Sequence, residues 1–439
     1  MKVRKTIIGR LLALRSRKAI TKIQGAILVA VIVVAALGAF FYLYMTAAPT
    51  SDIIIAAPLP LSGSMATIGL SCQRGHELAV EDINAAGGIK SLGGRNITMV
   101  YGDTQSDPTV ATSETERLIA TYNPTAMLGA YSSALTLVAT EVSERHKVPF
   151  LAPMAQIDSL TDRGFKYVFR QAIRSSNTGV KAVDMIADMA QHFGSPVKNV
   201  ALVYDNSALG QTISNSSRQH ALQLNYTIVF DEMFTANSQD YSPLVIRLKA
   251  VNPQPDVVFI LAYLNDAILL ANTFQEFKLN AKAFVGMAGA GFLEPSFITS
   301  AGNNSEYFFA GTGFTRDLNI TGLADVVRRF ELKYPQFMNE HADLCYAATW
   351  VIKEVLELSG TLHPSNPLDP DSIRDAFLKI DISSGPAALT AAGRVKFNEK
   401  GDNIYGTQIY LQILNASQRA VWPFSIASTT AVFPRPPWE

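Results

Sequence analysis

Residues 80 to 110, VEDINAAGGIKSLGGRNITMVYGDTQSDPTV, decide the fold of the chain. They predict a helix, a turn, a strand and an acidic loop, and they follow a strand-like stretch, IIIAAPLPLSG, at 53 to 63. The helix ends where Gly87 and Gly88 supply a positive φ that other residues resist. Apolar residues then alternate along the strand at 97 to 101. The chain therefore opens as a β-α-β unit.

Strand-like runs recur along the chain, with amphipathic helices between them. Strands and helices that alternate in this way predict parallel, doubly wound sheets. The part after residue 50 has about 390 residues, which is long for a single core and predicts two lobes. The runs lie at 53 to 59, 96 to 102, 125 to 129, 148 to 152, 198 to 204, 226 to 230, 256 to 262 and 282 to 286.

The first 45 residues have the pattern of a membrane anchor. Residues 1 to 24 carry eight Lys or Arg and no acid, and residues 25 to 45 carry no charge. A helix of this second length spans roughly 31 Å, about the thickness of a bilayer hydrocarbon core. The positive-inside rule then predicts a cytoplasmic tail and an external domain. A cleaved signal peptide is the alternative, although its apolar core is usually only about 7 to 15 residues long.

The composition outside the basic tail limits the classes of partner. There, 29 Lys and Arg face 37 Asp and Glu, a net charge of −8, which argues against nucleic acid as a partner. The two cysteines, Cys72 and Cys345, lie in helix patterns, and we expect them to be small core residues rather than a disulfide.

Six Asn-x-Ser/Thr sequons could be glycosylated on an external protein. No cysteine near residues 40 to 50 offers the lipid anchor that many bacterial binding proteins use. Together these features lead to the hypothesis of an archaeal cell-surface protein. The sequons are at Asn96, Asn215, Asn225, Asn303, Asn319 and Asn415.

Several motifs resemble those of one protein family. PLSG at 60 to 63, DINAAGGI at 82 to 89 and the DTQSDP loop at 103 to 108 occur in the order found in extracellular solute-binding proteins of the branched-chain amino acid type. Such proteins are the substrate-capturing subunits of ABC importers. The resemblance continues to about residue 415, through PTAMLGAYSSALT (124 to 136), VPFLAPMAQ (148 to 156), ALVYDNSALGQ (201 to 211), DYSPLVIRLKAVNPQPDVVFILAY (240 to 263) and VKFNEKGD (395 to 402).

The resemblance implies an α/β fold of the type 1 periplasmic binding protein kind, preceded here by the predicted transmembrane helix. Two doubly wound parallel-sheet lobes would be joined by a hinge of three chain crossings, with ligand in the cleft between them. It implies lobe 1 from 52 to 171 plus 312 to 397, and lobe 2 from 172 to 311 plus 398 to 439.

Ligands of open α/β sheets bind beyond the carboxyl ends of the strands, where helix N-termini present unpaired amides. Tyr131, Ser132 and Ser133 occupy such a place, because they follow a strand-like run and begin a helix. A hydroxyl and exposed amides there would suit a ligand carboxylate. A simple helix N-cap explains either serine equally well. The resemblance implies that Ser133 contacts the carboxylate.

The resemblance also implies ligand contacts in two further loops. The backbone and side chains of Met154, Ala155 and Gln156 would contact the ligand, and Gln156 stands where the family has Thr or Ser. Gln156 keeps a donor and an acceptor on a longer side chain. Tyr263 falls at the cleft aromatic of the second lobe, where it would cover an apolar ligand side chain or hydrogen-bond through its hydroxyl.

Ala288 is the most consequential departure from the family pattern. Amino acid binders of this type often place a Glu there to pair with the ligand ammonium, and a buried ammonium without a partner is costly. Asp103 or Asp205 could substitute, although a loop or helix-cap role explains each of them too. Ile68 and Leu209 replace aromatic residues. A branched or aromatic carboxylic acid, or an amide, would also fit such a pocket.

Enzyme motifs are missing from the sequence. It has no nucleotide-binding glycine fingerprint, P-loop, nucleophile elbow or H-E-x-x-H, and its six His residues have no metal-site spacing. We therefore expect no enzyme activity, no cofactor and no metal. The sequence predicts a membrane-anchored external binding protein that holds a small organic ligand, a branched-chain or otherwise apolar amino acid, in the cleft between two lobes. It would pass this ligand to an ABC permease and its ATPase. The alternative is a surface sensor for a small carboxylic acid or amide that signals through a partner without transport.

Overall fold

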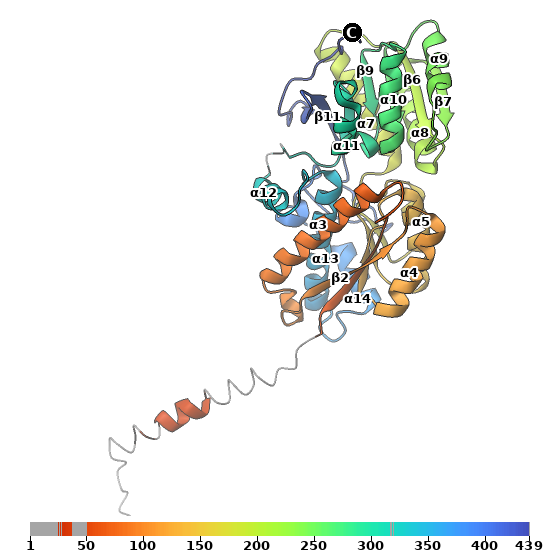
Figure 1. Ribbon diagram of the computed structural model, residues 1–439. Helices are drawn as coiled ribbons and strands as arrows, with labels where there is room; N and C mark the ends of the chain where they lie inside the picture. The colour runs from red at the N-terminus through yellow and green to blue at the C-terminus, as the bar shows by residue number, and fades with distance from the viewer. Residues whose placement is uncertain are drawn as a thin grey trace, which may run out of the picture. The chain divides into compact units, whose positions relative to one another are not determined.

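The computed structural model describes residues 25, 27, 29–36, 51–316, 318 and 320–438 (Figure 1). The chain divides into two units, residues 1–51 and 52–439. Most of the predicted basic tail and of the predicted anchor at 25 to 45 lies outside the described residues, and residues 29–36 are helical. Among the helices that are described, none has the length and apolar character needed to cross a membrane.

The first sheet of the larger unit has five parallel strands in the order β2-β1-β3-β4-β5. Strand β1, the second in this order, pairs on both sides, since Ile55 pairs with Met99 of β2 and with Ala126 of β3. The strands are β1 (Ile53–Leu59), β2 (Ile97–Asp103), β3 (Ala126–Leu128), β4 (Phe150–Ala152) and β5 (Val168–Arg170).

Helices cover both faces of this sheet, as parallel strands require. Alternate residues of β1 point to opposite faces, so that Ile55 packs in a core with α3, α13 and α14, while Ala56 packs in a core with α4 and α5. Figure 1 shows these helices around β2. The helices of this part are α3 (Ala66–Ala85), α4 (Pro108–Tyr122), α5 (Ser133–Arg145), α6 (Ser159–Asp162), α13 (Glu340–Leu362) and α14 (Pro370–Lys379), with the 3-10 turns η1 (Lys90–Leu92) and η4 (Pro386–Ala388). A further helix, α12 (Leu323–Lys333), packs on α3 and α13.

The second sheet has seven strands in the order β12-β11-β10-β9-β8-β6-β7. Five of them are parallel, and β11 and β12 form an antiparallel edge that the sequence did not predict. Asn415 and Ala416 join these two strands with φ values of 52° and 54°, as a two-residue hairpin turn requires. The strands are β6 (Asn199–Asp205), β7 (Thr227–Phe234), β8 (Val257–Leu261), β9 (Ala283–Gly286), β10 (Phe309–Thr312), β11 (Ile409–Leu414) and β12 (Ser417–Trp422).

Helices also cover both faces of the second sheet. One core contains α7 and α8, and the other contains α9, α10 and α11. These helices are α7 (Ser175–His192), α8 (Ala208–Gln223), α9 (Ser242–Ala250), α10 (Leu264–Glu276) and α11 (Pro295–Ala301), with the 3-10 turns η2 (Ala290–Leu293) and η3 (Gly302–Ser305).

We refer to the first sheet with its helices as lobe 1 and to the second sheet with its helices as lobe 2. The chain passes from lobe 1 to lobe 2 after β5, returns to lobe 1 after β10, and enters lobe 2 again before β11. The exact residue boundaries proposed from the sequence stay a prediction.

Two local predictions agree with the structure. Gly87 and Gly88 have φ values of 99° and 67°, which explains the glycine pair at the end of α3. Cys72 and Cys345 are both free and buried, in the core that α3 and α13 share. The expected role of the two cysteines as core residues is therefore confirmed.

Candidate functional site

One pocket is lined by loops of both lobes at the carboxyl ends of their strands. The loops follow β3, β4 and β9, and the first turns of α8 and α13 and the residue before α10 complete the lining. Open α/β sheets place ligands at such positions. The space open to water is about 50 Å³, room for roughly three to five water molecules. The lining residues are Tyr131, Ser132, Ser133, Met154, Ala155, Gln156, Leu209, Tyr263, Ala288, Gly289, Glu340 and His341.

All six residues proposed from the sequence line this pocket. Lobe 1 supplies Ser133 and the loop 154–156, and lobe 2 supplies Tyr263 and Ala288. Leu209 also lines the pocket, whereas Ile68 is buried in the core of lobe 1. The structure thus brings the six together, and their contact with a ligand stays a prediction.

The two serines at the start of α5 have different partners. Ser132 is the N-cap, and its Oγ accepts a hydrogen bond from the Leu135 amide at 3.3 Å. The Oγ of Ser133 accepts from the Ile157 amide at 3.3 Å, and Ser133 is buried at the pocket wall. Ser132 thus caps the helix. The hydroxyl of Ser133 acts as an acceptor in its bond with Ile157, so its hydrogen can still be donated to an acceptor in the pocket.

Gln156 is held by lobe 2, which the sequence did not predict. Its side-chain Oε1 accepts a hydrogen bond from the Thr178 hydroxyl at 2.8 Å, and its backbone oxygen accepts from the Ser175 amide at 2.7 Å. Both partners lie in the first turn of α7. The expected acceptor for a ligand is therefore occupied, and the side-chain amide is what Gln156 still offers to the pocket.

Aromatic rings form part of the pocket wall. Tyr131 has a φ of 82°, a conformation that costs a residue with a side chain on the order of 1 kcal/mol. Its ring meets the Tyr263 ring edge to face at 6.5 Å and the His341 ring edge to face at 5.3 Å. Met154 also lines the pocket, and its sulfur lies 3.8 Å from the sulfur of Cys72. The wall is thus mostly apolar.

The loop after β9 owes its glycines to the packing of the protein. A Cβ on Gly289 would lie 2.0 Å from Cδ1 of Leu293, and a Cβ on Gly291 would lie 2.4 Å from the Leu264 amide nitrogen. Neighbouring protein atoms therefore account for both glycines. Ala288 itself is buried and faces the pocket.

Neither alternative carboxylate lines the pocket. Asp103 binds the loop after β1, where its Oδ1 accepts from the Leu61 and Ser62 amides at 3.0 Å each. Asp205 is buried, and its Oδ1 accepts from the Ser207 amide at 3.0 Å. The loop and cap roles therefore describe these two residues.

Two residues of α13 that the sequence did not single out also line the pocket. Glu340 is its first residue and His341 is its second. The His341 Nδ1 lies 2.5 Å from Oε1 of Glu294, the residue before α11 in lobe 2, and both side chains are buried. Burial lowers the pKa of His341, but the charges of Glu294 and Glu340 outweigh burial and raise that pKa to about 9. His341 is therefore a cation at neutral pH.

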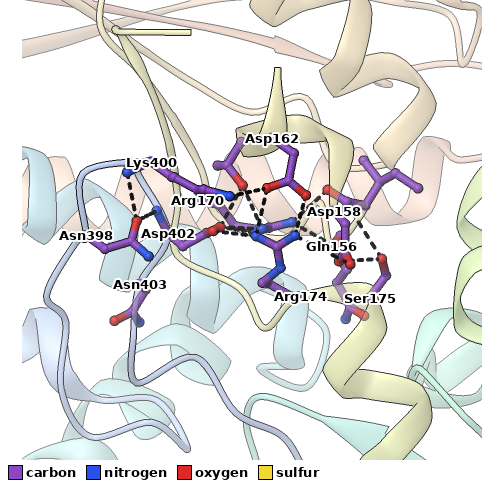
Figure 2. Close-up of polar contacts among 12 residues, drawn as sticks. Gln156, Asp158, Asp162, Arg170, Arg174, Ser175, Asn398, Lys400, Asp402 and Asn403 are labelled. Carbon is purple, nitrogen blue, oxygen red and sulfur yellow. Dashed lines mark hydrogen bonds and ion pairs between the residues drawn. The ribbon is translucent and has the colours of Figure 1, made fainter. Parts of the chain in front are cut away.

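A charged network connects the pocket with the hinge, as Figure 2 shows. Arg170, at the end of β5, is completely buried, and its Nε donates to Oδ1 of Asp402 in the third crossing at 2.9 Å. Its Nη1 donates to the backbone oxygens of Gln156 at 2.8 Å and Ile157 at 2.7 Å. Arg174, before α7, donates to the other oxygen of Asp402 at 2.7 Å. Two hinge crossings and a pocket loop thus share one buried guanidinium.

A larger surface groove of about 630 Å³ lies elsewhere, lined by residues of α11, α12 and β12. Exposed Leu332 and Phe337 form part of it, and it contains none of the six proposed residues. The smaller pocket between the lobes is therefore the candidate site.

Comparison with known proteins gives a consistent result. A family model described as a periplasmic binding protein matches residues 52–417. A Leu/Ile/Val-binding protein homologue of Brucella melitensis is 30% identical over 387 residues, which cover 87% of this chain and 93% of that protein. These matches confirm the resemblance seen in the motifs.

Solved structures share the fold. The isoleucine complex of a branched-chain amino acid transporter substrate-binding protein from Streptococcus pneumoniae has a TM-score of 0.72 at 24% identity, covering 84% of this chain and 97% of that one. A solute-binding protein of an ABC transporter from R. palustris, in complex with benzoate, has a TM-score of 0.71 at 18% identity, covering 88% and 99%.

Proposed function

Because the chain belongs to the periplasmic binding protein family, we propose that it is the external substrate-binding subunit of an ABC importer. The family consists of solute-binding proteins and not of enzymes. The proposed ligand is one small apolar amino acid, held between the lobes. The observation that carries the proposal is that one pocket is lined by Ser133 and the loop 154–156 of lobe 1 and by Tyr263 and Ala288 of lobe 2.

The chemistry of the pocket supports an apolar ligand with a carboxylate. The hydroxyl of Ser133 and the amides at the start of α5, a helix of 13 residues, would hold the carboxylate, which the helix dipole also favours. Leu209, Met154 and Tyr263 would contact the apolar side chain. The relatives named for Leu, Ile and Val binding support the same class of ligand.

Closure of the two lobes would couple binding to recognition by the permease. Contacts from both lobes to one ligand stabilise the closed form over the open form. Gln156 already touches both, since its loop belongs to lobe 1 and Thr178 belongs to lobe 2. A permease that binds only the closed form would then receive only loaded protein.

The N-terminal segments support an anchored external location. The uncharged stretch at 25 to 45 would anchor the domain in the membrane, and the basic tail would stay in the cytoplasm. Five of the six sequon asparagines are exposed, as glycosylation requires, and Asn319 lies outside the described residues. The exposed ones are Asn96, Asn215, Asn225, Asn303 and Asn415.

A sensor of a small carboxylic acid or amide is the second candidate. Ala288 favours it, because no carboxylate stands at that position to pair with an ammonium. The benzoate complex of the R. palustris protein, which has the same fold, contains such an acid. A sensor would signal through a partner without transport.

A thermal-shift screen of the chain from residue 50 onward tests these proposals. The panel contains amino acids, their amides, and branched and aromatic carboxylic acids. A ligand at 100 times its Kd adds about 2.7 kcal/mol to the free energy of unfolding, which raises Tm by some degrees. We expect shifts with aliphatic amino acids. Shifts with acids or amides alone would favour the second ligand class, and no shift with any member would contradict the proposed function.

A further inference from the structure

The charges at the pocket wall are not balanced. Glu340 and His341 are the charged residues among those that line it. His341 already has an anionic partner, because its Nδ1 lies 2.5 Å from the buried Glu294 carboxylate. Glu340 forms no ion pair with any residue in the described part of the chain. The wall therefore holds one carboxylate in excess.

The protein fixes this carboxylate in place. Asn339 caps α13 by accepting from the Ala342 amide at 3.0 Å, so that Glu340 is the first helical residue. The Gly313 amide, in the second hinge crossing, donates to Oε1 of Glu340. Burial raises the pKa of Glu340 overall, while the charge of His341, the Gly313 amide and the Thr312 hydroxyl oppose that rise and favour the charged form. The group is thus positioned, and two carboxylates, Glu294 and Glu340, share the single cation His341 at this wall.

The hydrogen bond from Gly313 does not by itself require a charge at this place. A glutamine oxygen would accept equally from Gly313 at a lower cost of burial. A carboxylate offers about four acceptor positions, so the Gly313 amide leaves capacity for a second donor. Burial, together with the charge of Glu340, raises the pKa of the neighbouring Asp343 well above its usual range. An added cation in the pocket would balance Glu340.

We infer that the Glu340 carboxylate binds the ammonium group of the ligand, so that lobe 1 performs the task that Ala288 cannot. The inference rests on the proposed function, in which this pocket is the ligand site. The inference narrows the ligand to a molecule with a primary ammonium, an α-amino acid. The site would then bind this amino acid in preference to the carboxylic acid of the same shape.

Both polar ends of the ligand would then be held by lobe 1. Ser133 would bind the carboxylate and Glu340 the ammonium, while Leu209, Tyr263 and Ala288 of lobe 2 cover the apolar side chain. Lobe 1 would therefore bind the amino acid before closure, and lobe 2 would add apolar contact afterwards.

The test uses the full chain and three probes of nearly equal shape, measured by isothermal titration calorimetry. Leucine carries both charges, 4-methylpentanoate lacks the ammonium, and leucinamide lacks the carboxylate. Glu340→Gln is expected to weaken the binding of leucine and of leucinamide by at least about 30-fold. It should change the affinity for 4-methylpentanoate by less than about threefold. Ser133→Ala is expected to weaken the binding of leucine and of 4-methylpentanoate and to leave the affinity for leucinamide nearly unchanged. Glu141→Gln, the same change at a side chain that is 57% exposed, is the control and should alter none of the three.

Several outcomes would overturn the inference. One is an equal loss for all three probes in Glu340→Gln, which means a structural role, and another is no loss for leucine. Unmodified protein that binds 4-methylpentanoate as tightly as leucine would overturn it without any variant, so the test does not depend on the folding of Glu340→Gln. Binding that responds to Ser133→Ala but not to Glu340→Gln would leave the proposed function intact. If none of the probes binds, both the inference and the proposed function are contradicted.

Discussion

The imidazole of His341 and the carboxylate of Glu294 form a buried pair across the two lobes, with Nδ1 and Oε1 2.5 Å apart. His341 belongs to α13 of lobe 1, and Glu294 precedes α11 of lobe 2. The Asn339 side chain also donates to Oε1 of Glu294, at 3.3 Å. The arrangement of the lobes described here therefore depends on a charge that pH can remove.

The first prediction concerns this pH dependence. The pKa of His341 is raised from 6.5 to about 9, so the stabilisation from its charge is complete below about pH 6.5 and is lost as pH rises through 9. The free energy of unfolding should fall by on the order of 3 kcal/mol between these limits. Urea unfolding at pH 6.5, 8 and 9.5 measures it.

The reference for that experiment is the double variant Glu294→Gln with His341→Gln. His341→Gln alone would leave Glu294 buried without a cation, which costs more than the pair contributes. The double variant removes both charges, so its stability should change less over the same pH range. Equal slopes in the two proteins would show that other groups cause the dependence.

The second prediction concerns Arg170. Its guanidinium donates at once to Asp402, to Thr161 and to two backbone oxygens. The ammonium of a lysine cannot reproduce this planar arrangement of donors. Arg170→Lys should lower the free energy of unfolding by about 3 to 5 kcal/mol, because a buried pair loses its geometry. Chemical denaturation measures the loss.

Arg247→Lys is the matched control for Arg170→Lys. The side chain of Arg247 is 54% exposed and lies 2.6 Å from Glu232, so its replacement should have a much smaller effect. Similar losses in the two variants would contradict the central role of Arg170 at the hinge.

The sequence predicted the parts that depend on short-range patterns. Period and turn signals placed the β1 strand at 53 to 59, the rule of carboxyl ends placed Ser133 at the pocket, and the family resemblance placed Tyr263 there. The strands β5 and β10, of three and four residues, were not predicted, although β3, β4 and β9 of the same lengths were. The terminal hairpin of β11 and β12 was also missed.

The missed site residues are pairs that folding brings together. Arg170 and Asp402 are 232 positions apart, and neither belongs to a motif that names the other. Glu340 and His341 begin a helix after a hinge crossing, where a single sequence gives no sign of what they face. The N-cap asparagine at 339 was the one available signal that the residues after it start a helix.

The third prediction separates the two serines of α5. Ser133→Ala should weaken binding of an amino acid by about 1.5 to 3 kcal/mol if the hydroxyl pairs with its carboxylate. It should also lower stability by about 1 kcal/mol or more, because the buried Ile157 amide loses its acceptor. Ser132→Ala removes the cap to the Leu135 amide and should lower stability by about 1 kcal/mol with little effect on affinity. Calorimetry and thermal unfolding of both variants measure these effects. The reverse pattern would assign the cap to Ser133.

The fourth prediction concerns how Tyr263 contributes. Its ring meets the Tyr131 ring edge to face at 6.5 Å, and in the described part of the chain its hydroxyl makes no hydrogen bond. We therefore expect the ring, and not the hydroxyl, to cover the apolar side chain of the ligand. Tyr263→Phe should keep leucine affinity within about threefold, and Tyr263→Ala should weaken it about tenfold or more, since roughly 1.5 to 3 kcal/mol of apolar burial is lost. Titration of both variants with leucine and with alanine, whose side chain is too short to need this cover, decides the point. A large loss in Tyr263→Phe would instead mean that the hydroxyl binds the ligand.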